Sequence, residues 1–206
     1  MKCNVVCIQT YPKMNQKEEN LSHMETLLRK AMESHPDTQL IVFPELAVTG
    51  YQCGENFKDL AETATIDSTS IKKMSALAKE FHVHIVYGMA EKKEDILYNS
   101  QFFLDDTGVL LGTYRKVHLF DSEKNYFTPG DQFKVFDTKI TMGQKVKKGD
   151  LLTVMDLDGV ERHQCQKTSR SLDPLGRILA SINDEKDGII HTALDYDVIH
   201  IFTSHK

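Results

Sequence analysis

The stretch IVFPELAVTGY, residues 41–51, places a glutamate directly behind an apolar run and a proline. Ile41, Val42 and Phe43 are typical of a core strand, and the proline that follows cannot donate to the strand ladder. Glu45 is therefore expected at the carboxyl end of that strand, where open α/β sheets usually bind ligands. The plainer alternative is an ordinary loop glutamate at a strand terminus. The segments around this stretch have to decide between the two.

A strand–helix–strand unit surrounds this stretch. Residues 5–8 are apolar, as in a buried strand, and residues 16–34 carry apolar side chains at helical spacing. Asn15 is the expected N-cap of this helix, with Glu18 three residues later as in a capping box. Because residues 40–43 form the next strand, we expect a right-handed crossover and parallel pairing.

The strand–helix alternation continues and then gives way to hairpins. Ser68 or Ser70 is expected to cap a helix that ends near Phe81, and residues 83–87 form a strand that Gly88 terminates. Further strands are expected at 96–104, 109–114, 177–181 and 189–194, the first two joined by the turn Asp105-Asp106-Thr107-Gly108 and the third preceded by the turn Asp173-Pro174-Leu175-Gly176. Together these signals predict a layered α/β protein with a mixed sheet.

The composition narrows the function classes. The chain has 206 residues, 40% of them hydrophobic, and a formal charge of −5. The negative charge argues against a nucleic-acid partner, and no apolar stretch reaches membrane-spanning length. With no signal-peptide pattern at its start, the chain is expected to be cytoplasmic, with free thiols.

The cysteines and histidines give weak signals only. Cys3 and Cys7 share one face of a strand and are expected to be core residues, and none of the four cysteines has zinc-ligand spacing. His82 and His84 have the spacing of a metal pair on a strand, but no third ligand is evident, so ordinary half-buried histidines are favoured. No metal and no cofactor is expected.

A second informative stretch is YRKVHLFDSEKNYFTPGD, residues 114–131. Lys116 directly follows an expected strand, and Glu123 lies in a polar turn before a Pro-Gly pair. Either residue alone is most simply a solvated surface charge. With Glu45, however, they would supply two carboxylates and one amine, each next to a strand end.

These stretches together resemble the nitrilase superfamily of carbon–nitrogen hydrolases, near its omega-amidase-like members. The resemblance rests on three pieces in the family's order: the first strand and helix leading to VFPELAVTGY, GTYRKVHLFDSEKNYFTPGDQFKVFDT (112–138), and KTSRSLDPLGRILASINDEKDGIIHTALDYD (167–197). It implies a nitrilase-like αββα sandwich, incomplete here, with a mixed sheet and hairpins. Its expected parts are 1–138, an atypical β insert at 139–166, and 167–206 completing the same domain.

The resemblance also implies a mechanism and catalytic residues. Members hydrolyse amides or nitriles with a glutamate as general base, a cysteine thiolate as nucleophile and a lysine that stabilises the tetrahedral intermediate. By motif the glutamate is Glu45 and the lysine is Lys116. Glu123 matches a second glutamate that many members carry, which positions substrate or holds the lysine. The implied partner is a small-molecule amide.

The family's cysteine has no counterpart in this sequence. Residues 139–166 replace the strand that carries it, Cys165 lies in a polar context (ERHQCQK), and Cys53 matches no motif position. The alternative is therefore an inactive relic or chimera that serves as a binding or structural module. Residues 143–160 also resemble the end of a glucose-type enzyme IIA domain, so a sugar-phosphotransfer component is a remote third possibility. Because the missing strands would uncover apolar surface, we expect the chain to form homo-oligomers or to be marginally stable.

Overall fold

The computed structural model describes residues 2–132, 134, 136, 138, 140, 169–172, 178–182 and 187–195. In chain order its elements are β1 (Lys2–Gln9), α1 (Lys17–Ser34), β2 (Leu40–Val42), the 3₁₀ turn η1 (Gly54–Asn56), α2 (Phe57–Leu60), α3 (Thr69–Phe81), β3 (His84–Lys93), β4 (Ile96–Leu104), β5 (Leu110–Arg115), the 3₁₀ turn η2 (Asp121–Asn125), β6 (Ser169–Leu172), β7 (Ile178–Ile182) and β8 (Gly188–Asp195). Of the described helices, none is long and apolar enough to cross a membrane.

Six strands form one mixed sheet in the order β5-β4-β3-β2-β1-β8. The first two strand–helix–strand units make β1, β2 and β3 parallel to one another, as the sequence predicts. Strands β4, β5 and β8 are added antiparallel to their neighbours. A separate two-stranded sheet of β6 and β7 lies against β1 and β8. The predicted α/β class with a mixed sheet and hairpins is confirmed, and the insert at 139–166 lies outside the described residues except for residue 140.

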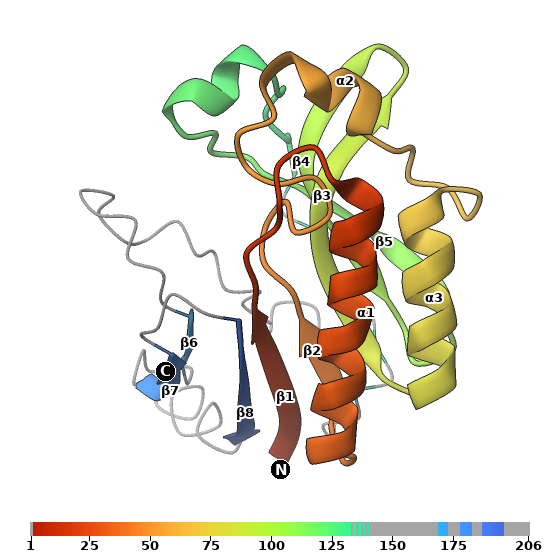
Figure 1. Cartoon of the computed structure of the whole chain (residues 1–206), viewed down its shortest axis with the longest axis vertical. Coiled ribbons are helices and arrows are strands. Elements are labelled where there is room, and N and C mark those ends of the chain that lie inside the picture. The colour runs from red at the N-terminus through yellow and green to blue at the C-terminus, as the bar shows by residue number, and fades with distance from the viewer. Residues whose placement is uncertain are drawn as a thin grey trace, which may run out of the picture.

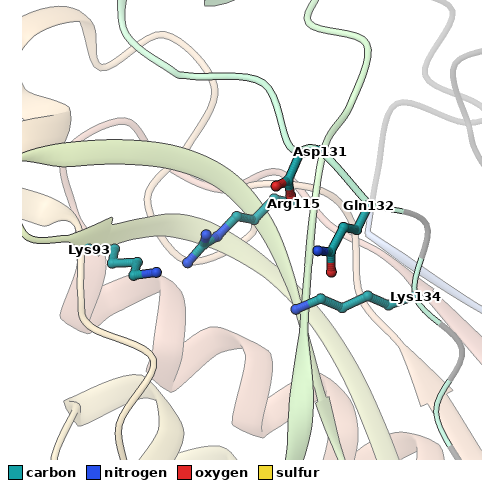
Figure 2. Close-up of a pocket in the computed structure, with 5 residues that line it drawn as sticks. All are labelled: Lys93, Arg115, Asp131, Gln132 and Lys134. Carbon is teal, nitrogen blue, oxygen red and sulfur yellow. The ribbon is translucent and has the colours of Figure 1, made fainter.

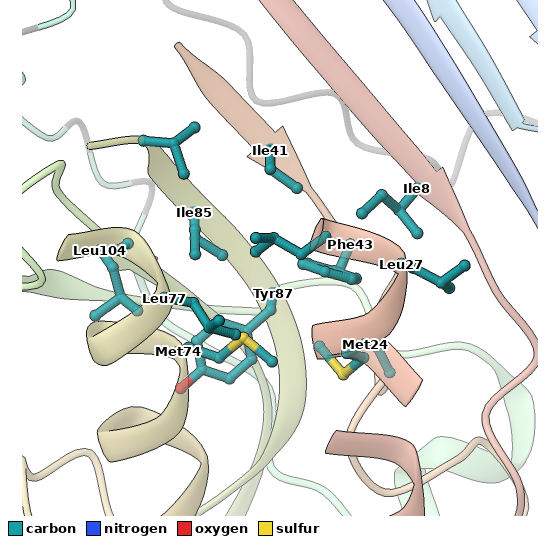
Figure 3. Close-up of a cluster of buried hydrophobic side chains, with 14 of the residues drawn as sticks. Ile8, Met24, Leu27, Ile41, Phe43, Met74, Leu77, Ile85, Tyr87 and Leu104 are labelled. Carbon is teal, nitrogen blue, oxygen red and sulfur yellow. The ribbon is translucent and has the colours of Figure 1, made fainter. Parts of the chain in front are cut away.

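Helices α1 and α3 lie side by side over one face of the sheet (Figure 1). Their apolar stripes meet the strands in one buried cluster, in which Met24 and Leu27 of α1 and Met74 and Leu77 of α3 are each at most 6% exposed (Figure 3). Burying side chains of this size contributes about 1.5–3 kcal/mol each, so this layer supplies much of the driving force for folding. The helices therefore cover one face of the sheet.

Three local predictions at chain turns are wrong. Asn15 is not the cap of α1: it adopts a left-handed conformation, and Gln16 occupies the cap position without a side-chain bond. The polar partner of this turn is Asn20, whose side-chain oxygen accepts the backbone N–H of Lys13 at 2.8 Å. His82 ends α3 in a left-handed conformation and lies outside β3, so it does not share a strand face with His84.

The third wrong prediction concerns Gly88, which does not terminate its strand. Strand β3 continues from His84 to Lys93 and pairs with β4 along that whole length. The absence of a side chain at Gly88 serves a different purpose, which is to let another segment approach the sheet.

The cap of α3 is shared between two segments. Ser68 occupies the cap position as one of the two predicted serines, but its hydroxyl donates to the carbonyl of Thr63 and accepts no hydrogen bond from the backbone N–H groups of the helix. Glu62 supplies the cap from outside, since one of its carboxylate oxygens accepts both the backbone N–H of Ser70 at 2.9 Å and its hydroxyl at 2.7 Å. A carboxylate at a helix N-terminus is favoured by the helix dipole.

Candidate active site

The turn after β2 holds Glu45 against the middle of β3. The backbone N–H of Gly88 donates to the carbonyl of Pro44, and its carbonyl accepts the N–H of Val48, both at 3.2 Å. A Cβ atom at Gly88 would lie 2.6 Å from Glu45 Cα and 2.5 Å from Leu46 N, closer than real Cβ atoms come. Leu46 itself has a positive φ of 48°. Glycine in β3 and a strained residue in the turn thus fix the backbone of Glu45.

Lys116 is held at the end of β5 by its two neighbouring segments. Its backbone N–H donates to the carbonyl of Asn99 in β4, and its carbonyl accepts the N–H of Gly130, both at 2.8 Å. A Cβ at Gly130 would lie 2.3 Å from the carbonyl oxygen of Arg115, so glycine is required for this approach. The Pro-Gly turn therefore closes over the end of β5 and fixes the lysine backbone.

The three residues that the sequence predicts for the site come together. Lys116 Nζ lies 2.9 Å from Glu45 Oε1 and 3.0 Å from Glu123 Oε2. The side chains are 11%, 18% and 15% exposed respectively, so the cluster is largely shielded from water. Glu123 Oε2 also accepts the backbone N–H of Phe120 at 2.7 Å, which ties η2 to the cluster. The convergence predicted for Glu45, Lys116 and Glu123 is what the structure contains.

The electrostatics of the cluster favour a charged lysine. Burial pushes the pKa of the Lys116 ammonium down, but the negative charge of Glu45 and the hydrogen bonds to Glu45 and Glu123 outweigh it and raise the pKa above the ordinary lysine value. The ammonium is thus a fixed cation at neutral pH. Such a group can stabilise an oxyanion that develops beside it, and a carboxylate next to it can take up a proton.

Sequence reasoning missed two residues of this site. Asn99 of β4 is 2% exposed, and its side-chain nitrogen donates to Glu45 Oε1 and, at 3.0 Å, to Glu123 Oε1. The hydroxyl of Tyr51 lies 3.2 Å from Glu45 Oε2. Tyr51 closes the quoted stretch and could have been suspected from its proximity in sequence, whereas nothing in the strand pattern around Asn99 separates it from any other polar strand residue.

Two of the three cysteines in the described residues are buried core residues. Cys3 is buried as predicted, whereas Cys7 is only half-buried, and burial raises the pKa of each thiol to about 11. Cys53 lies in an apolar cluster with its Sγ 3.0 Å from the carbonyl oxygen of Thr49, and burial raises its pKa despite the lowering effect of the Asn15 backbone. A protonated thiol that donates to a carbonyl is a poor nucleophile. Cys165 lies outside the described residues.

A separate pocket lies near the end of β5, lined by Arg115 rather than Lys116. Its volume is about 230 Å³, and its lining side chains are Lys93, Arg115, Asp131, Gln132 and Lys134 (Figure 2). Adjacent strand residues point to opposite faces, so Arg115 and Lys116 serve different sites.

Arg115 is also committed to an ion pair inside the sheet. It binds Glu91, which is 2% exposed, through Nε at 3.0 Å and Nη2 at 2.5 Å, and its guanidinium stacks on the ring of Tyr98. The hydroxyl of Ser100 donates to the same carboxylate at 2.6 Å. Within the described part of the chain, no three His, Cys, Asp or Glu side chains gather as a metal site would require.

Comparison with known proteins decides the family. The sequence model of the family "Carbon-nitrogen hydrolase" matches residues 4–154. The chain belongs to this family. A protein named "probable nitrilase" from Schizosaccharomyces pombe is 32% identical over 246 aligned residues, which cover 96% of this chain and 90% of the relative. A Pyrococcus abyssi nitrilase is 39% identical, and an omega-amidase of Saccharomyces cerevisiae is 31% identical.

The extent of these similarities differs. The alignments with the Pyrococcus and Saccharomyces proteins cover 65% and 67% of this chain but only 50% and 52% of the relatives, so the chain spans about half the length of these two. Among solved structures, a Saccharomyces cerevisiae member of branch 10 of the nitrilase superfamily has a TM-score of 0.79 over 98% of this chain at 23% identity. A carbon–nitrogen hydrolase from Helicobacter pylori has a TM-score of 0.61 over 68% at 30% identity. These structures support the nitrilase-like sandwich.

Proposed function

We propose that this chain hydrolyses the carbon–nitrogen bond of a small amide. The observation that carries the proposal is the contact of Lys116 Nζ with both Glu45 and Glu123 in a shielded cluster. The relatives named as omega-amidases, from Saccharomyces cerevisiae and Bos taurus, favour short amides over nitriles as the first substrates to test.

The roles follow from the positions of the charges. Glu45 is the general base, because its Oε1 is held by Lys116 while its Oε2 contacts only the half-exposed Tyr51 among the bonds described here. Lys116 faces the oxyanion of a tetrahedral intermediate as a fixed cation. Glu123 holds Lys116 from the other side through two contacts of 3.0 and 3.3 Å.

The nucleophile is the part of the proposal that needs its own test. A thiol would attack the amide carbon and release ammonia or an amine, and water would then free the acid from the acyl-enzyme. Cys53 has the burial and bonding of a structural thiol, so we assign the role to Cys165 within the segment that replaces the family's cysteine strand.

The experiment is ammonia release from short aliphatic amides by the purified chain. Glu45→Gln is expected to lower the rate at least a hundredfold, as loss of a general base does, while Glu55→Gln, at an exposed carboxylate, leaves it unchanged. Cys165→Ser should abolish release and Cys53→Ser should not. Release that survives Glu45→Gln would disprove the assignment.

A second function is favoured by one observation. None of the three cysteines in the described residues is exposed or paired with a base. Should the chain release no ammonia from any amide, the inactive alternative applies, in which Lys116 and the two glutamates remain as a binding module for a small amide. Isothermal titration with the same amides would detect it, and Lys116→Met should abolish that binding.

A further inference from the structure

Asn99 lies where the backbone and side chains of the site meet. It sits in β4, pairs with Ala90 of β3, and is 2% exposed. Its side-chain nitrogen donates to Glu45 Oε1 and Glu123 Oε1, and its carbonyl accepts the backbone N–H of Lys116 at 2.8 Å. One residue thus contacts all three charged members of the site.

The side-chain amide of Asn99 is chemically suited to its position between the two glutamates. Two carboxylates and one ammonium leave the cluster with one uncompensated negative charge, so the glutamates repel each other where they converge. A primary amide has two N–H donors and no charge, and can give one hydrogen to each carboxylate. Asn99 therefore holds the two glutamates together without adding another charge beside Lys116.

The two oxygens of Glu45 are used differently. Oε1 accepts from Lys116 Nζ at 2.9 Å and from Asn99, whereas Oε2 has the hydroxyl of Tyr51 at 3.2 Å. Tyr51 is 49% exposed and lies at the surface. Anchoring Oε1 from the buried side leaves Oε2 toward the exposed side, where a general base has to meet the proton it takes up.

We infer that Asn99 is a positioning residue that orients the Glu45 carboxylate, with Oε1 anchored and Oε2 presented to the reacting proton, and that keeps both glutamates on Lys116. This inference rests on the proposed function for the meaning of the proton, but its geometric part can be measured without substrate. The raised pKa of Lys116 gives the readout, because it depends on both carboxylates staying in contact with the ammonium.

The test is competitive acetylation of lysines by acetic anhydride at pH 9, read by mass spectrometry, with the exposed Lys124 as internal reference. In Asn99→Ala the glutamates lose their common donor and turn away, so the free-amine fraction of Lys116 rises and it is labelled about tenfold faster, which corresponds to one pKa unit. In Asn99→Asp, of nearly the same shape, the common donor is lost as well, but the new carboxylate adds a negative charge beside the ammonium, so the pKa of Lys116 stays raised and Lys116 is labelled several-fold more slowly than in the wild type.

The control variant adds a negative charge but leaves the side-chain amide of Asn99 unchanged. Asn125→Asp places a carboxylate at an exposed position of η2 and should leave Lys116 labelling within about twofold of the wild type. Opposite shifts in the two Asn99 variants support the positioning role. Shifts in the same direction, as general loosening of the fold would give, or no shift in either variant, would overturn it.

Kinetics separate this inference from the proposed function. If the chain releases ammonia, Asn99→Ala lowers kcat by about tenfold to a hundredfold with little change in KM, since orientation of the base matters in the transition state. If the wild type releases ammonia but the Asn99 variants leave Lys116 labelling unchanged, the positioning role of Asn99 is rejected and the proposed amidase activity stands. If the two Asn99 variants shift Lys116 labelling in opposite directions but the wild type releases no ammonia, the positioning role of Asn99 stands and the proposed amidase activity is rejected.

Discussion

Replacing Gly88 with alanine is expected to move Glu45 away from Lys116. The new Cβ would lie 2.5 Å from the nitrogen of Leu46 and 2.6 Å from Glu45 Cα. Ordinary contact begins near 3.4 Å, so the turn has to retreat by about 1 Å, because both obstructing atoms belong to the backbone. The bond of 2.9 Å between Lys116 Nζ and Glu45 Oε1 would then lengthen beyond hydrogen-bonding distance.

Two magnitudes follow from that displacement. Overpacking of this kind costs about 1–3 kcal/mol of unfolding free energy, measurable by urea denaturation. A misplacement of about 1 Å in a catalytic group costs on the order of a hundredfold in rate, measurable as ammonia release. Acetylation of Lys116 should accelerate as well, since its contact with Glu45 is lost.

The matched control is Gly54→Ala. Gly54, unlike Gly88, has a positive φ of 58°, and a Cβ there would meet nothing closer than the Tyr126 hydroxyl at 3.9 Å. This variant should lose about 1 kcal/mol through backbone strain and keep the wild-type Lys116 labelling. A Gly88→Ala variant whose unfolding free energy lies within about 0.5 kcal/mol of the wild type, and whose Lys116 is labelled at the wild-type rate, would show that the turn at Glu45 does not depend on this glycine.

Other variants test the remaining charges and thiols. Lys116→Met should destabilise the chain by about 3 kcal/mol at pH 7, because it leaves two shielded carboxylates unpaired. Since the folded-state pKa of this lysine is raised, the difference from the wild type in urea unfolding should persist up to the ordinary lysine pKa of 10.5 and shrink as the pH rises through the folded-state pKa. A difference that vanishes by pH 8 would contradict the electrostatics of the site. Arg115→Met should cost about 3–5 kcal/mol by orphaning Glu91, and adding Glu91→Gln should recover much of this in the same assay; a single variant as stable as the wild type would refute the pairing. In the folded chain at pH 8, iodoacetamide should spare the buried Cys3 and Cys53, and rapid labelling of either one in peptide maps would contradict its burial.

The apolar pattern was sufficient to predict the main layers. Residues 16–34 and the helix ending at Phe81 have one apolar stripe each, and a stripe of that width has to be buried against another element. The hairpin of β4 and β5 follows equally directly, because Asp105 binds the backbone of its own turn and Gly108 takes a positive φ of 81°. These elements depend on local chemistry, which a sequence displays.

Features that depend on a distant segment could not be predicted. Glycine often ends a strand, but at position 88 it is required because Glu45, more than forty positions earlier, approaches the backbone there. Asn15 satisfies the rules for a helix cap, yet Asn20 takes up the polar groups of that turn from inside the helix. In each case a tertiary contact overrides a local preference, and a single sequence does not show the contact.

The sequence likewise predicted only part of the site. Glu45 and Lys116 were identified by resemblance, and Asn99 was missed because one asparagine in a strand resembles any other polar residue. Yet the contacts described above that hold Glu45, Lys116 and Glu123 all come from residues 43–130. The charged cluster is therefore assembled by the part of the chain that precedes residues 139–166. The proposed amidase and the alternative binding module therefore use the same charged cluster and differ only in whether a thiol takes part.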